Sequence, residues 1–241
     1  MKKILLASVV VLLIFIIYLT TIDKKVYYLT LGDELSVSTD EVVSFSDNVV
    51  RYLNDNKKLE IFVNDFSKDN YYINDIISDI KENKKINHES KNISIKNALI
   101  KSDLLTISIG MNDIISKINI KNINLSNDYS FLYHDIDEIV IELDEMLKLV
   151  RTYCKEDIIL LGLYYPFNIQ NKELVNIFLY GNNKFKETSD KYNVRYIDIY
   201  NIFLEDDKYL SKNNTLYPSQ TGFNTIAEQI VVTINDTVLK K

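Results

Sequence analysis

Short apolar runs alternate with amphipathic segments along most of this chain. Five runs are rich in β-branched and aromatic residues and nearly continuous in apolarity, which is typical of strands covered on both faces of a parallel sheet. These predicted strands are Val26–Leu31, Leu59–Val63, Leu104–Ile109, Ile158–Leu163 and Val194–Ile199. Helical spacing of apolar residues marks the segments between them. The predicted helices are Glu41–Leu53, Tyr71–Ile80, Ile95–Ile100, Ile136–Tyr153, Glu173–Tyr192 and Thr221–Val238.

This alternation predicts a three-layer α/β/α sandwich of the flavodoxin-like kind, with a five-stranded parallel sheet and right-handed crossovers. Ligands of such sheets bind beyond the carboxyl ends of the strands. Three clusters of polar and glycine residues follow predicted strands and are expected at that edge: Gly32–Ser36, Gly110–Asp113 and Asn213–Gly222. The sequence therefore places a candidate site there.

The amino terminus carries a 19-residue stretch without a charge, Ile4–Ile22. As a helix it would be about 28 Å long, close to the hydrocarbon thickness of a bilayer. A cleaved signal peptide is the alternative, but the stretch is long for one and has no small-residue cleavage site. We therefore divide the chain into a membrane anchor, residues 1–25, and one domain, residues 26–241.

The expected location is the cell membrane, with a single pass and the domain on the extracytoplasmic side. The first predicted strand begins at Val26, almost where the apolar stretch ends. Its amino end should then lie near the bilayer, and the carboxyl edge of the sheet should point away from it. We expect the site to serve soluble or cell-wall ligands rather than lipids of its own membrane.

Composition narrows the possible partners. The formal net charge of −6 lacks the basic footprint that nucleic-acid binding requires, so no nucleic-acid partner is expected. Cys154 is the only cysteine, which excludes an intrachain disulfide and a cysteine-based zinc site. Cys154 is predicted to be a small core residue, and no cofactor or metal is expected.

Three motifs carry a resemblance to a known family. They are YYLTLGDELSVS at residues 27–38, SIGMNDI at residues 108–114 and NTLYPSQTGFNTIA at residues 214–227. In this order they are similar to the Gly-Asp-Ser-Leu, Gly-x-Asn-Asp and Asp-x-x-His-Pro blocks of the SGNH (GDSL-type) hydrolases. The resemblance implies the SGNH fold and an ancestry in ester hydrolysis by a serine, histidine and aspartate triad.

The resemblance also assigns the family's catalytic positions to residues of this chain. Glu34 stands at the nucleophilic serine, Tyr217 at the histidine and Asn214 at the aspartate. By a looser match, Lys68 stands near the glycine whose N–H lines the oxyanion hole. Asn112 alone keeps the family residue, as the side-chain donor of that hole.

Each replacement removes part of the serine mechanism. A glutamate carboxylate is a poor acyl acceptor, and a tyrosine with an ordinary pKa of about 10 is no general base near neutral pH. Asn214 is neutral and would not stabilise an imidazolium. Loss of such a triad costs on the order of 10⁶ in rate. Ordinary serine esterase activity is therefore not expected.

Three alternative chemistries use other residues near the same edge. His134 can serve as a substitute base for a Ser36 nucleophile, whereas the remaining histidine, His88, is predicted to be a solvated loop residue. Glu34 and Lys68 can form an ion pair that fills the old oxyanion hole. Asp33, Glu34 and Asp113 can together supply oxygen ligands for Ca²⁺ or Mg²⁺, although Asp33 and Asp113 are usually structural hydrogen-bonding residues in the family.

Two functions follow from these observations. The favoured one is a catalytically inactive SGNH-like domain at the cell surface, anchored through residues 4–22, that binds a glycan, peptide or protein ligand at the carboxyl edge of the sheet. The alternative is an unconventional esterase or acyl hydrolase with a rebuilt site, acting on esters of the cell envelope.

Overall fold

The computed structural model describes residues 25–118, 120, 123, 125, 127–167, 171–212 and 216–240. Five parallel strands form one sheet in the order β2-β1-β5-β6-β7. The strands are β1 (Val26–Gly32), β2 (Leu59–Val63), β5 (Leu104–Ser108), β6 (Asp157–Leu161) and β7 (Arg195–Ile197). The predicted five-stranded parallel sheet is thus confirmed. Each strand lies within three residues of its predicted bounds.

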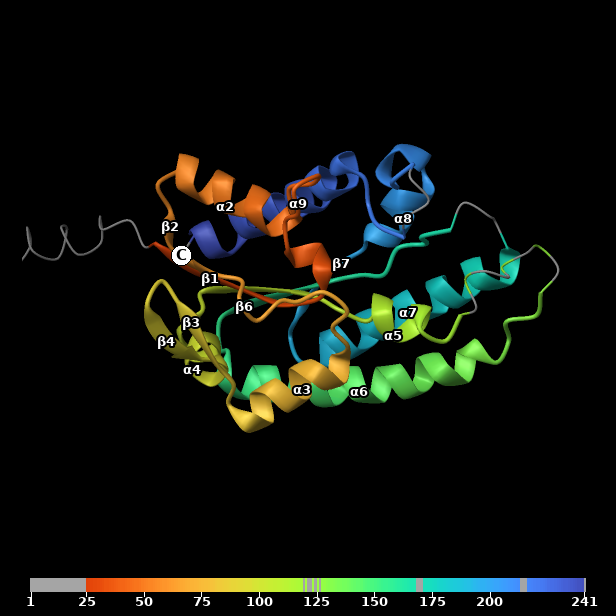
Figure 1. Ribbon diagram of the computed structural model, residues 1–241, viewed down its shortest axis with the longest axis horizontal. Helices are drawn as coiled ribbons and strands as arrows, with labels where there is room; N and C mark the ends of the chain where they lie inside the picture. Colours follow the sequence, from red (N-terminus) through yellow and green to blue (C-terminus); the bar gives the residue numbers. More distant parts are fainter. Residues whose placement is uncertain are drawn as a thin grey trace, which may run out of the picture.

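Helices cover both faces of this sheet, as the crossover rule requires (Figure 1). One face carries α2 (Phe45–Asp55), α9 (Gln220–Asp236) and the short α8 (Ile199–Leu204). The other carries α3 (Ile73–Glu82), α6 (Leu132–Tyr153) and α7 (Lys172–Lys191), with α4 (Ile95–Lys101) and α5 (Met111–Ile115) at its two ends. Short 3-10 turns lie at Glu34–Ser36 (η1), Asp207–Tyr209 (η3) and Val238–Lys240 (η4). The three-layer prediction is confirmed.

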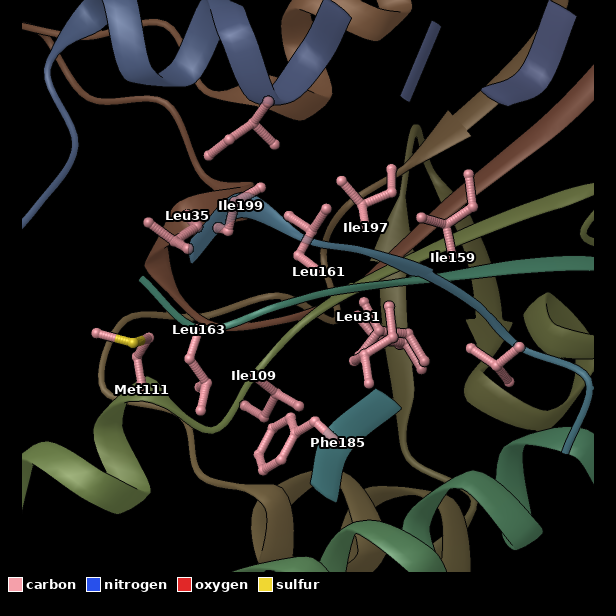
Figure 2. Packing of buried hydrophobic residues seen from close by; sticks show 14 of the residues in the cluster. Leu31, Leu35, Ile109, Met111, Ile159, Leu161, Leu163, Phe185, Ile197 and Ile199 are labelled. Atoms are coloured by element: carbon pink, nitrogen blue, oxygen red, sulfur yellow. The ribbon is translucent and has the colours of Figure 1, made fainter. Parts of the chain in front are cut away.

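The core lies on both faces of the sheet because the strands are apolar on both sides. Strand β1 is buried at every position. In Figure 2, Leu161 and Ile197 lie on one side of the sheet, while Leu31 and Ile109 lie on the other near Phe185 of α7. Cys154 is fully buried at the end of α6, which confirms its prediction as a small core residue.

A second sheet was not predicted. Residues Lys85–His88 (β3) and Lys91–Ser94 (β4) form an antiparallel hairpin. Its turn residues Glu89 and Ser90 both have positive φ, at 47° and 66°. Such turns usually contain glycine or asparagine, so the sequence carried no hairpin signal here. The prediction of His88 as a solvated loop residue is wrong, because its side chain is only 13% exposed and its Nδ1 lies 2.7 Å from Asp65 Oδ2.

The predicted membrane anchor, residues 1–25, lies almost entirely outside the described residues. Within the part of the chain that is described, no helix is both long enough and apolar enough to cross a membrane. The first described residue, Lys25, directly precedes β1. The chain therefore enters the domain at the end of the sheet where the parallel strands begin.

Candidate active site

The site begins where β1 ends. Gly32 has φ of 136°, and a Cβ there would meet the backbone carbonyl of Ser108, so only glycine suits this position. Asp33 follows and is 1% exposed. Its N–H donates to the Ser108 carbonyl oxygen at 2.8 Å, and its Oδ1 accepts the Leu35 N–H at 3.2 Å. This capping starts the 3-10 turn η1 and delivers the next side chain, Glu34, to the carboxyl edge of the sheet.

The Glu34 carboxylate occupies an anion-binding position. Its Oε2 accepts hydrogen bonds from Asn112 Nδ2 at 3.0 Å and from the Asn70 backbone N–H at 3.2 Å. Asn112 lies at the start of α5, and its Nδ2 also donates to the Tyr71 carbonyl oxygen at 3.1 Å, which fixes the amide orientation. Two donors converging on one oxygen form the arrangement that holds an oxyanion in acyl transfer. Here the chain's own carboxylate fills it.

The backbone donor of this hole is Asn70 rather than Lys68. Asn70 has φ of 56°, a left-handed conformation that asparagine tolerates and glycine prefers. The Lys68 N–H instead donates to the Gly32 carbonyl oxygen at 2.9 Å. The looser match, which placed this backbone donor at Lys68, is therefore two residues too early in the chain. The turn-forming dipeptide Asp69-Asn70 was the signal that could have located the donor.

The Lys68 side chain does not neutralise Glu34. Its Nζ lies 5.2 Å from the centre of the Tyr71 ring, and no ion pair between Lys68 and Glu34 is formed among the described residues. Contact with Lys84 and partial burial lower the pKa of Lys68. Lys84 in turn is bound by Asp79 at 2.7 Å and by the Tyr71 hydroxyl at 2.8 Å. The proposed ion-pair plug is wrong, because hydrogen-bond donors rather than an ammonium group satisfy Glu34.

Tyr217 lies beside Glu34 at the same edge. Its side chain is 43% exposed, and the following Pro218 pairs with Leu210 in an isolated bridge. Burial, the charge of Glu34 and a hydrogen bond to its carboxylate raise the pKa of Tyr217 to about 12. The phenol is thus protonated at neutral pH and does not act as a base. Asn214, the third predicted triad position, lies outside the described residues.

Two aspartates behind the site have raised pKa values. Burial and the Glu34 charge raise the pKa of Asp33 well above its usual range. Its Oδ2 has no hydrogen-bond partner among the described residues. Asp113 is 6% exposed, and burial together with the charge of Glu142 raises its pKa to about 7. The Ile73 N–H donates to its carboxyl oxygens at 3.3 and 3.4 Å.

The alternative cation site at Asp33, Glu34 and Asp113 is not assembled. The described residues contain no group of three or more His, Cys, Asp or Glu side chains arranged to hold a metal ion. Asp33 and Asp113 instead bind backbone N–H groups of the turns that follow the strands. These contacts fit the structural role that the family resemblance implies for both.

The alternative Ser36–His134 pair is not assembled either. Ser36 is fully buried, and its Oγ lies 2.8 Å from Ser108 Oγ, so no substrate reaches it. His134 lies in the first turn of α6, with 79% of its side chain exposed, and its Nε2 is 3.5 Å from Glu138. Among the described residues, Ser36 and His134 therefore do not form a serine–histidine pair.

A pocket of about 370 Å³ opens beside Glu34 and Tyr217. Its apolar wall is made by Val37, Val42, Pro218 and Phe223. Carboxylates stand around it, and no lysine or arginine lines it among the described residues. The acidic lining residues are Glu34, Glu41 and Asp69. The pocket is accordingly an apolar cleft with a negative rim.

The fold and the Gly32, Asn112 and Tyr217 positions together define the SGNH class of hydrolase-like domains. A family model for GDSL-like lipase/acylhydrolase matches residues 30–230, and this chain belongs to that family. No curated protein matches the chain.

Solved structures of this class share the fold at low sequence identity. The acetylxylan esterase Axe2 from Geobacillus stearothermophilus is 18% identical, with a TM-score of 0.64 over 88% of this chain and 95% of that chain. The lipase Lip_vut3 from a goat rumen metagenome is 20% identical, with a TM-score of 0.63 over 85% and 95%. Catalytic mutants of Axe2 replace a serine, an aspartate and a histidine.

Proposed function

We propose that this chain is a membrane-anchored GDSL-family domain that binds a ligand at its old active site and does not hydrolyse esters by the serine mechanism. Residues 4–22 form the single-pass anchor, and the domain lies on the extracytoplasmic side. One observation carries the loss of catalysis: Glu34 replaces the nucleophile, and its Oε2 fills the oxyanion hole made by Asn70 and Asn112.

The chemistry of this arrangement opposes acyl transfer in two ways. A substrate carbonyl oxygen must displace a carboxylate that already has two hydrogen bonds, and charge-assisted bonds of this kind are roughly twice as strong as neutral ones. Tyr217, at the position of the family histidine, supplies no base, because its pKa is raised to about 12. The site is therefore suited to retaining a ligand rather than transforming it.

The cleft beside Glu34 supports a ligand class. Its volume of about 370 Å³ suits a sugar unit or a short peptide segment, and the ring of Tyr217, which is 43% exposed, offers a stacking surface beside the apolar wall. The negative rim favours a neutral or cationic group over an anionic one. Tighter binding of uronic-acid oligosaccharides than of neutral or amino sugars would contradict this preference.

The decisive test restores the triad. We expect the full-length chain in detergent to hydrolyse p-nitrophenyl acetate no faster than buffer does. The triple variant E34S/N214D/Y217H frees the oxyanion hole and supplies nucleophile, base and orienting carboxylate. Its rate should exceed that of the wild-type chain by roughly 10³-fold or more.

The double variant E34S/N214D is the matched control, because it has the serine but no base, and it should stay near the wild-type rate. Adding Asn112→Ala to the triple variant should remove most of the gain. Turnover by the unmodified chain would instead show that a rebuilt hydrolytic site exists, and the binding proposal would be wrong.

A further inference from the structure

Two lysines lie over one tyrosine ring next to α3. Lys68 follows β2 and Lys84 follows α3, yet their Nζ atoms lie 5.2 and 5.5 Å from the centre of the Tyr71 ring. Their amino groups contact each other. Lys68 is half-buried, and 28% of the Lys84 side chain is exposed. Two ammonium groups in contact repel one another strongly in such a place, so one of them gives up its proton more readily than an ordinary lysine.

Lys84 is the member of the pair that keeps its charge. Its Nζ donates to both carboxylate oxygens of Asp79 at 2.7 Å and to the Tyr71 hydroxyl at 2.8 Å. Asp79 is 8% exposed, and a carboxylate this buried requires a cation beside it. Burial by itself lowers the pKa of Lys84, but the hydrogen bonds to Asp79 and Lys68 outweigh burial and raise the pKa.

Among the described residues, Lys68 has no carboxylate partner of its own. The acidic groups that face it are Asp79 and Asp75. Asp79 is already bound to Lys84, and Asp75 Oδ2 accepts the Tyr72 N–H at 2.9 Å at the start of α3. The contact with Lys84 and partial burial accordingly lower the pKa of Lys68.

The Tyr71 ring attracts an ammonium group at Lys68 and to that extent favours the charged form. This attraction is weaker than the repulsion from the Lys84 ammonium, because a full charge in contact produces a stronger field than the quadrupole of a ring. A lysine beside a second cationic group is activated as a nucleophile, since its neutral amine is the reactive form. Lys68 is therefore the reactive amine of this pair.

We propose that Lys68 is an acyl-accepting residue, modified by activated carboxyl compounds such as esters with good leaving groups, acyl phosphates and thioesters. The Nζ electron pair attacks the acyl carbon, and a C–N bond replaces the bond to the leaving oxygen or sulfur. The leaving group departs with the electrons of the broken bond, and water takes the proton from the nitrogen. The product is a stable amide, so each chain reacts once at this position. Glu34 takes no part in the reaction, so acylation of Lys68 does not depend on the proposed binding role.

Timed acetylation of the full-length chain in detergent tests this assignment. The chain is treated with p-nitrophenyl acetate near neutral pH, and peptide mass spectrometry measures the acetylated fraction of each lysine. Lys81 is the internal reference, because it lies on α3 with 57% of its side chain exposed and is paired with Glu145 at 2.6 Å.

We expect Lys68 to react at least roughly threefold faster than Lys81, and Lys84 to react more slowly than either. Each unit by which the pKa of an amine falls raises its neutral fraction near neutral pH about tenfold. A lower intrinsic nucleophilicity offsets part of this gain, as it does for thiols. Acetylation of Lys68 no faster than that of Lys81, or faster acetylation of Lys84 than of Lys68, would overturn the proposal.

Three variants identify the cause of the reactivity. Lys84→Met removes the second ammonium group and should slow acetylation of Lys68 to the rate of Lys81 or below. Lys84→Arg keeps a cation beside Asp79 and should retain most of the wild-type rate at Lys68. The matched control Lys81→Met removes the same charge from α3 and should leave that rate unchanged. An undiminished rate at Lys68 in Lys84→Met, folded as judged by circular dichroism, would contradict the proposal.

The pH dependence of the wild-type chain tests the same point without any substitution. The rate at Lys68 should level off at a lower pH than the rate at Lys81, because the Lys68 amine loses its proton first. Parallel pH profiles at the two lysines would overturn the proposal. The proposed loss of ester hydrolysis fails separately, because steady release of p-nitrophenolate reports turnover, whereas the peptide masses report the amide at Lys68.

Discussion

At the residue scale, Glu34 stands where the family motif has its serine, and its carboxylate satisfies Asn112 Nδ2 and the Asn70 N–H. Buried or half-buried donors without partners cost about 1–3 kcal/mol each, so a side chain that fills the hole also stabilises the fold around it. The charge of Glu34 also acts on Tyr217, whose pKa burial and that charge raise to about 12.

An emptied hole should bind a small carboxylate. In the variant E34A, acetate can take the place of the lost Glu34 carboxylate, so excess acetate should raise the melting temperature by about 1–3 °C. The wild-type chain should show no such shift at equal ionic strength set by chloride. Adding Asn112→Ala to E34A should remove the effect. An equal response of the wild-type chain and E34A would mean that Glu34 does not fill the hole.

Asp113 should make stability depend on pH. Its folded pKa of about 7 lies above the ordinary value, so protonation favours the folded state. The contribution of this group is fully present below about pH 4 and is lost as pH rises toward 7. In Asp113→Asn this slope should vanish. Between those pH limits, the free energy of unfolding of the variant should rise relative to that of the wild type by on the order of 4 kcal/mol at most.

Urea unfolding of both proteins across this pH range measures the difference. Asp40→Asn, which removes the same charge from an exposed position, should leave the slope unchanged. Parallel stability curves for Asp113→Asn and the wild-type chain would show that Asp113 is ionised in the folded protein.

At the element scale, the turn from β1 into η1 positions the whole site. Gly32 approaches the Ser108 carbonyl of β5 too closely for a side chain, and Asp33 N–H binds that same carbonyl oxygen at 2.8 Å. This crossing of two strand ends sets the distance between Glu34 and Asn112. The positions of the side chains in the site therefore depend on this backbone contact.

Gly32→Ala should disrupt this turn. A side chain at φ of 136° is strained, and the added Cβ would push β1 away from β5. We expect a loss of roughly 2–4 kcal/mol in the free energy of unfolding, measured by urea denaturation. Gly181→Ala in helix α7 is the matched control, because its added Cβ meets only side chains, the nearest being Leu163 at 3.1 Å. A loss at Gly32 no larger than at Gly181 would contradict this account of the turn.

At the scale of the whole molecule, the parallel sheet separates the point where the chain enters the domain from the candidate site. Every strand begins at the end where Lys25 enters and finishes at the end that holds Glu34 and Tyr217 (Figure 1). The length of the strands therefore separates the start of the domain from the candidate site.

The strands and helices of this fold could be read from the sequence because their patterns are local. Leu59–Val63 has the predicted bounds, and α6 begins four residues before its predicted start. The hairpin at residues 85–94 escaped prediction because its turn uses Glu89 and Ser90 at positive φ. The contact of His88 was not predicted either, since its partner Asp65 is 23 residues away in the chain.

The sequence by itself determined the family and the order of the strands along the chain, since both follow from residue types at fixed spacing, and it predicted the replacement of the serine, histidine and aspartate. Only the tertiary structure decided how the replacements interact. It brought Asn70, rather than Lys68, to the oxyanion hole, because a left-handed backbone conformation directs that N–H toward Glu34. It buried Ser36 and exposed His134, so these two side chains do not form the alternative nucleophile and base. Contacts between residues far apart in the chain depend on packing, which no local pattern encodes.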